Sequence, residues 1–168
     1  MARPRATRKG WPDAVADSRI SPMNAPRPVV AVSICIFRGE EVLLVLRGRA
    51  PFAGLWSLPG GRVEFGERLE DAVRREALEE TGLPVAEVAF VQIHEAIDAP
   101  NGAHAVIAVF RALAAASPDT PPQAADDAAD ARFVSLAELE MLSQTGATTD
   151  GLLDVIAAAR KRHGTAPR

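Results

Sequence analysis

The stretch GRVEFGERLEDAVRREALEETGL, residues 61–83, carries the strongest structural signal in this chain. From about Arg68 its periodicity predicts a helix, and Gly82 ends that helix because glycine readily takes the left-handed conformation that closes helices. At about 100° per residue the apolar side chains share one stripe. They are Leu69, Ala72, Val73 and Leu83. We expect this stripe to pack inward, as the apolar side of an amphipathic helix does.

Two glutamates, Glu76 and Glu80, fall in the middle of this stripe, and Glu79 lies at its edge. An ionised carboxylate in such a place is costly unless a partner compensates for it. A solvated acidic face is the ordinary explanation of paired glutamates, but the outward positions are others: Asp71, Arg74 and Leu78. Three carboxylates beside the Pro59-Gly60-Gly61 turn offer hard oxygen ligands that suit Mg²⁺ or Mn²⁺, with backbone carbonyls as further ligands.

Arg75 is placed to orient these carboxylates. It lies one turn before Glu79 and can hold a carboxylate by a bidentate pair. Glu67, at the start of the helix, is the other candidate partner and also suits the positive end of the helix dipole. We therefore expect Arg75 to act as an orienting residue.

The whole stretch resembles the box of the Nudix hydrolases, G-x5-E-x7-R-E-U-x-E-E-x-G-U, in which U is a bulky aliphatic residue. The matching residues are Gly61, Glu67, Arg75, Glu76, Glu79, Glu80, Gly82 and Leu83. Ala77 departs from the pattern because it is smaller than the usual residue at the first U, which affects local packing and leaves the chemistry unchanged. The preceding segment, residues 54–60, also resembles the family's lead-in, so the similarity covers roughly residues 29–142.

The resemblance implies an α/β/α sandwich with a mixed β-sheet, and metal-dependent hydrolysis of a pyrophosphate bond. By resemblance, Glu76 and Glu80 are the principal ligands of Mg²⁺ or Mn²⁺, and the Gly60 backbone carbonyl is a further one. Glu79 either binds a second metal ion or orients water. The family places its general base either in the box or on a later loop, so the box alone does not identify the base.

Asp127 is the candidate for the family's late acidic residue, which precedes the aromatic residue of a strand, here Phe133. A carboxylate there can hold another ion or take a proton from the attacking water. If the segment is extended, Asp126 points the opposite way and serves as an internal control. Glu79 is the alternative base.

Candidate substrate contacts outside the box carry weaker signals. Arg47 and Arg49 lie on the loop before the metal turn, where they either clamp a terminal phosphate or are solvated surface residues. Phe52 is a candidate for stacking on a base, whereas Trp56 is expected in the core. Gly61 belongs to the turn that lets a substrate approach the bare backbone.

Runs of β-branched and apolar residues predict strands separated by turn residues. The predicted strands span residues 29–37, 41–46, 55–58, 85–97, 103–113 and 132–134. Two further helices are predicted, one capped by Ser135 and containing Glu138, the other at 152–161 with Asp150 as its N-cap. Residues 98–102 are predicted as a turn and 114–125 as a loop. This order favours an α/β fold, a mixed sheet with helices on both faces.

The composition fits one soluble globular domain, with 168 residues of which 48% are apolar and 24% charged. The net charge of −3 gives no reason to expect nucleic-acid binding, and no apolar run reaches the length that spans a membrane. The lone cysteine, Cys35, excludes an internal disulfide framework and favours a cytoplasmic location. We expect a Nudix domain at 28–163, a flexible tail at 1–27 without a visible signal peptide, and a short tail at 164–168. Met23 is an alternative translational start.

The absence of tyrosine and the presence of Pro100 limit the range of candidate substrates. The family's dinucleoside-polyphosphate members carry a diagnostic tyrosine, and this chain has no tyrosine. ADP-ribose members carry a proline downstream of the box, and Pro100 lies close to that position. We therefore expect a small-molecule nucleotide substrate, ADP-ribose or a related nucleotide sugar, with a nucleoside triphosphate as the alternative. A non-catalytic nucleotide sensor is disfavoured because all box glutamates are present, and a homodimer is left open.

Overall fold

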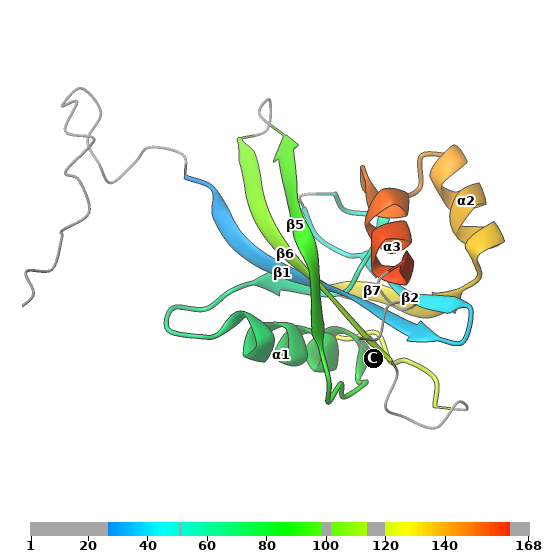
Figure 1. The fold of residues 1–168 in the computed structure, drawn as a ribbon. Coiled ribbons are helices and arrows are strands. Elements are labelled where there is room, and N and C mark those ends of the chain that lie inside the picture. Colours follow the sequence, from blue (N-terminus) through cyan, green and yellow to red (C-terminus); the bar gives the residue numbers. More distant parts are fainter. Residues whose placement is uncertain (1–26, 51, 99–101, 114–119, 162–168) are drawn as a thin grey trace, which may run out of the picture.

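A computed structural model describes residues 27–50, 52–98, 102–113 and 120–161 (Figure 1). The tails predicted at 1–27 and 164–168 lie outside these residues except for Arg27, and so does Pro100. None of the described helices is long and apolar enough to cross a membrane.

Seven strands and three helices form within the described residues. The strands are β1 (Val29–Arg38), β2 (Glu41–Arg47), β3 (Trp56–Ser57), β4 (Gly60–Arg62), β5 (Ala89–Asp98), β6 (Ala103–Leu113) and β7 (Ala128–Val134). The helices are α1 (Leu69–Thr81), α2 (Leu136–Gln144) and α3 (Leu152–Lys161). The strands form one sheet in the order β3-β2-β1-β6-β5, with β4 paired to β1 and β7 to β2. Since β1 and β6 are parallel and the other pairs antiparallel, the predicted mixed sheet is confirmed.

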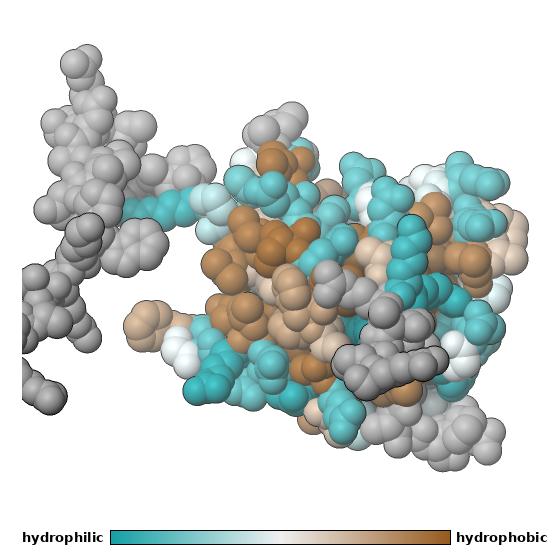
Figure 2. All heavy atoms as spheres, in the orientation of Figure 1, coloured by the Kyte–Doolittle hydropathy of each residue, from teal (hydrophilic) through white to brown (hydrophobic). Residues whose placement is uncertain are grey.

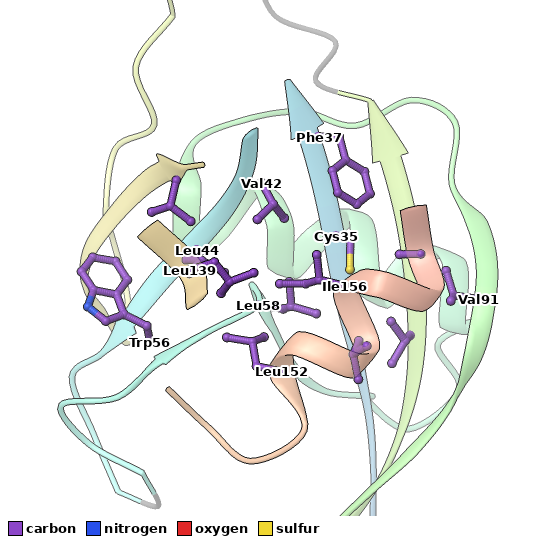
Figure 3. Packing of buried hydrophobic residues seen from close by; sticks show 14 residues of the cluster. Cys35, Phe37, Val42, Leu44, Trp56, Leu58, Val91, Leu139, Leu152 and Ile156 are labelled. Atoms are coloured by element: carbon purple, nitrogen blue, oxygen red, sulfur yellow. The ribbon is translucent and has the colours of Figure 1, made fainter. Parts of the chain in front are cut away.

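The helices cover both faces of the sheet, as the sequence predicted (Figure 1). Alternate side chains of β1 point to opposite faces. Those that pack with α1 are Val32, Ile34 and Ile36. Cys35 and Phe37 point the other way and pack with α2 and α3. Figure 3 shows this second cluster, in which Ile156 of α3 lies beside Cys35. The apolar residues therefore form two layers of core, one on each side of the sheet.

Cys35 is a free cysteine in the middle of this second cluster. Burial raises the pKa of its thiol to about 12. A thiol reacts as its thiolate, so at neutral pH this side chain is an inert part of the core. The cysteine therefore takes no part in the chemistry of the site described below.

Three strands differ from the sequence-based prediction by more than one residue at an end. Gly60 and Gly61, predicted as a turn, belong to β4, which pairs with residues 31–33 of β1. The strand predicted from Val85 begins instead at Ala89, where the pairing with β6 starts, and the Val85 side chain is buried in the cluster under α1. β7 begins at Ala128 because its first half pairs with β2. For β4 and β7 the pairing with a distant strand sets the boundary.

The ends of the later helices test the predicted caps. The Ser135 hydroxyl accepts a hydrogen bond from the Glu138 N–H at 3.2 Å, which confirms it as the N-cap of α2. Asp150 was wrong as the N-cap of α3, because the first helical hydrogen bond runs from the Val155 N–H to the Gly151 carbonyl. Gly151 has a φ of 74°, a left-handed conformation that suits glycine. Asp98, predicted in a turn, is the last residue of β5.

Candidate active site

The C-terminal half of α1 carries the glutamates on the side that faces β4 and β7. Glu76 and Glu80 are 9% and 6% exposed, whereas the Glu79 side chain is 46% exposed. The predicted division, with two glutamates inside the stripe and one at its edge, is therefore confirmed. The helix ends at Gly82, whose φ is 68° and whose N–H donates to the Leu78 carbonyl. Ala77 is fully buried, so the small residue at the family's bulky position lies within the core.

Two glycines of β4 bring the backbone against these carboxylates. The Gly60 N–H donates to Glu80 Oε2 at 2.9 Å. A Cβ atom at Gly61 would collide with the Glu76 carboxylate, and one at Gly60 would collide with the Val32 carbonyl. Gly60 therefore requires glycine for a steric reason, and a side chain at Gly61 would displace the Glu76 carboxylate. The sequence predicted only a turn at these two positions.

Arg75 holds the carboxylates of this half of the molecule in place. Its Nε and Nη2 donate to the two oxygens of Glu67, each at 2.9 Å. Its Nη1 donates to Glu76 at 2.8 Å and to Glu79 at 3.1 Å, and its Nη2 also donates to the Arg62 carbonyl at 3.1 Å. The bond from Arg75, together with one from the Glu64 N–H, lowers the pKa of Glu67 to about 2. Both partners that the sequence proposed for Arg75, Glu67 and Glu79, are confirmed.

Burial raises the pKa values of the two inner glutamates, Glu76 and Glu80, whereas that of Glu67 is lowered. It raises the pKa of Glu80 to about 7, against the hydrogen bond from Gly60, and the nearby Glu76 carboxylate raises it further. Burial also raises the pKa of Glu76, while the bond from Arg75 opposes the rise. Two adjacent carboxylates that are costly to ionise form a site that gains from a bound cation.

A tight turn at Asp126 and Asp127 lies opposite the glutamates. Asp126 has a φ of 53°, and the Ala128 N–H donates to the Ala125 carbonyl at 3.1 Å. The expected extended segment, with Asp126 pointing away, is therefore wrong. The Asp126 charge raises the pKa of Glu76, and that of Asp127 raises the pKa of Glu80. Both aspartates are thus close enough to act on the box, and Asp126 is a candidate that sequence reasoning had set aside.

The loop after β2 supports this turn from the other side. The Gly48 N–H donates to the Asp127 carbonyl at 2.8 Å, and Arg49 Nη1 lies 2.6 Å from Asp127 Oδ1. The positive charge of Arg47 lowers the pKa of Glu80, so the Arg47 side chain lies close enough to interact electrostatically with the box. The sequence grouped the two arginines by position alone, and the pairing of Arg49 with Asp127 could not be read from it.

The two aromatic residues considered for base stacking, Trp56 and Phe52, differ in how far they are buried. Trp56 is 8% exposed in the core, with the Arg132 guanidinium 4.6 Å from its ring centre, so the expected packing role is confirmed. Phe52 is 36% exposed and has a φ of 68° on the loop after β2. This conformation is unusual for a bulky residue, and the ring is accessible on the loop that also carries Arg49.

The oxygen atoms available as metal ligands decide whether this site fits a divalent cation. Glu76 and Glu80 are buried oxygen donors beside bare glycine backbone, which is the ligand chemistry that Mg²⁺ and Mn²⁺ prefer. Arg75 occupies one side of Glu76 and Glu79, and within the described ranges no three His, Cys, Asp or Glu side chains are grouped so as to hold a metal ion. The donor types fit the cation, and the assignment of individual ligands stays a prediction.

The chain is similar to known proteins over most of its length. The NUDIX domain family matches residues 27–154. An ADP-ribose pyrophosphatase of Methanocaldococcus jannaschii is 37% identical over 116 residues, which are 69% of this chain and 67% of that protein. A provisionally named 8-oxo-dGTP diphosphatase 2 of Mycobacterium tuberculosis is 48% identical over 61 residues, 36% of this chain and 43% of that protein.

Among solved structures, the NUDIX domain of Shewanella oneidensis NrtR, complexed with ADP ribose, has the same fold. Its TM-score is 0.70 at 24% identity, over 86% of this chain and 94% of that one. The family match spans the box, the buried glutamates and the paired Arg75 and Glu67, and the solved structure agrees with the fold. The chain belongs to the Nudix hydrolase family.

Proposed function

We propose that this Nudix hydrolase requires Mg²⁺ or Mn²⁺ and cleaves the pyrophosphate bond of a nucleoside diphosphate linked to a second group, with ADP-ribose as the favoured substrate. The observation that carries the proposal is the pair of buried carboxylates, Glu76 and Glu80, against the bare backbone of Gly60 and Gly61. Two like charges buried there destabilise the fold, and a bound divalent cation would compensate them.

In this proposal Glu76, Glu80 and Glu79 hold the cation together with the Gly60 carbonyl. A bound divalent cation neutralises charge on the phosphate oxygens and favours ionisation of water. Arg75 keeps Glu76 and Glu79 oriented through its own anchor on Glu67, and it acts through them without meeting the substrate.

Asp127 is the proposed acceptor of the proton from the attacking water, with Glu79 as the alternative. Its ion pair with Arg49 supports a shared role for the two residues. A phosphate group would compete for Arg49, and the Asp127 carboxylate would then be released toward the glutamates. Arg47 supplies further positive charge for the phosphates, and Phe52 a ring for the base.

The substrate class is supported by the relative named ADP-ribose pyrophosphatase, which matches over two thirds of this chain. The relative named for 8-oxo-dGTP matches over a shorter region and supports hydrolysis of a nucleoside triphosphate as the second candidate. A nucleotide sensor without catalysis is the least supported reading, since Glu76, Glu79 and Glu80 are all retained.

The test is a comparison of ADP-ribose and 8-oxo-dGTP as substrates, each with Mg²⁺, with Mn²⁺ and with a chelator. We expect hydrolysis only with a metal ion, and a kcat/KM for ADP-ribose at least about tenfold higher, equivalent to about 1.4 kcal/mol in the transition state. The reverse ranking would favour the triphosphate reading. Tight nucleotide binding without hydrolysis of either compound would favour the sensor.

A further inference from the structure

The face of the sheet beside α1 has an apolar area that no described element covers. β5 is the edge strand, paired only with β6 among the described residues. Ile93 lies opposite Ala108 and Phe90 opposite Phe110, and both partners belong to the core cluster under α1. Side chains opposite each other share a face, so Phe90 and Ile93 continue that core outward.

Five large apolar side chains make up this area, which we call the β5 edge surface. They are Val30 (56% exposed), Leu69 (39%), Phe90 (47%), Ile93 (53%) and Ile97 (61%). Leu69, which the sequence placed on the buried stripe of the helix, lines a hollow with Phe90 and Phe110. Figure 2 shows the hydrophobic residues gathered on this face, between α1 and β5.

The size of this surface can be compared with that of protein interfaces. With a large apolar side chain presenting roughly 150–250 Å² when fully exposed, these fractions leave on the order of 500 Å² of apolar surface. A standard interface buries about 800 Å² per partner, of which about 57%, or roughly 450 Å², is non-polar. The β5 edge surface therefore supplies the apolar part of one complete interface.

We propose that the β5 edge surface binds a second copy of this chain, in a two-fold dimer with the two β5 strands antiparallel. An edge strand presents unpaired N–H and C=O groups, and an identical antiparallel strand complements them. Phe90 lies near one end of β5, Ile97 near the other and Ile93 between them. Antiparallel pairing brings Phe90 of each copy toward Ile97 of the other, with the two Ile93 side chains at the centre.

This arrangement leaves the active site open. The hollow lies at the first turn of α1, lined by Arg68, Leu69, Glu70 and Asp71. The carboxylates lie in its last turns, where Glu80 meets Gly60 of β4. The β4 and β5 strands pair with different strands, β1 and β6, so the dimer would not cover the glutamates.

The first experiment measures the molar mass by light scattering from roughly 1 to 100 µM, a range that spans micromolar dissociation constants. We expect a mass near twice the 17.8 kDa of one chain at the upper end. Ile97→Lys places a charge in the interface and should weaken dimerisation at least about tenfold. Met141→Lys is the matched control, since Met141 on α2 is also 61% exposed, and it should leave the mass unchanged.

A second measurement identifies what covers the surface. Because Cys35 is buried and inert, Ile93→Cys introduces one reactive thiol, and Met141→Cys serves as its exposed control. Under the proposal, maleimide labels Cys at position 93 more slowly as the protein concentration rises. A monomeric wild type at 100 µM, or an Ile97→Lys variant that dimerises like the wild type, would overturn it. Slow labelling at every concentration would also overturn it, in favour of coverage by residues 1–26 of the same chain.

Discussion

Replacing Glu80 by glutamine should stabilise the metal-free protein at alkaline pH while removing its activity. Glu80 is 6% exposed, and its pKa rises from an ordinary 4.5 to about 7. Below pH 4.5 the carboxyl is protonated in both folded and unfolded chains, so its ionisation does not oppose folding. As the pH rises from 4.5 to 7 the unfolded chain ionises more readily, and stability is lost until the loss is complete above pH 7. At about 1.4 kcal/mol per pH unit, the full loss is on the order of 3 kcal/mol.

Glutamine keeps the oxygen that accepts from Gly60 and removes the charge. With roughly 2–4 °C for each kcal/mol in a chain of this size, Glu80→Gln in chelator should melt about 5–10 °C above wild type at pH 8. The difference should shrink to about 1–2 °C near pH 4.5. Differential scanning fluorimetry at the two pH values measures it, and hydrolysis with Mg²⁺ should fall by about 10²-fold or more.

The matched control is Glu140→Gln, because Glu140 is exposed on α2 and away from the box. It should show neither the pH-dependent gain in melting temperature nor the loss of activity. A Glu80→Gln variant that is less stable than wild type at pH 8, or equally shifted at both pH values, would refute the burial argument. Glu80 would then have a partner that stabilises its charged form without metal.

Four further experiments test the rest of the site and the tail. Gly61→Ala forces the Glu76 carboxylate to move and should lower kcat by about 10², measured beside metal affinity, which should fall with it. Arg75→Lys cannot reproduce the fork to Glu67 and should lower kcat about tenfold, with a change in KM of less than about twofold, in steady-state assays. Asp127→Asn should lower kcat more than Asp126→Asn, and the reverse ranking would make Asp126 the base. Deleting residues 1–22 should leave the melting temperature within about 4 °C, as scanning calorimetry can check.

Local sequence patterns predicted the elements whose cause is local. α1 has its period, its glycine stop and its buried glutamates as expected, because amphipathicity and a left-handed C-cap are written in consecutive residues. The same holds for β6, whose bounds match the prediction, and for Ser135 as a cap. Arg75 with Glu67 and Glu79 was also predictable, since all three lie within one short stretch.

What the sequence missed depends on residues far apart in the chain. Gly60 and Gly61 have no side chains to signal a strand, and the backbone of β1 makes them one. The alanine-rich start of β7 has little strand propensity, and β2 pairs with it nonetheless. The contacts of Gly48 and Arg49 with Asp127 join segments separated by some eighty positions, so no local pattern reports them.

Because β1 pairs in parallel with β6, the sheet cannot be completed until long after β1 has been synthesised. Val29 pairs with Ala105, and β2 pairs with β7 later still. At roughly 5–20 residues per second, the ribosome needs about 4–15 s to make the chain between those two residues. Throughout that interval Val32, Ile34 and Ile36 lack the strand beside them, and the helix that packs on them, which ends at Thr81, is complete before β6 begins. The glutamates of α1 therefore come to face the aspartate turn only after Asp127 has left the ribosome. Shorter nascent chains contain the Nudix box but cannot form the complete active site.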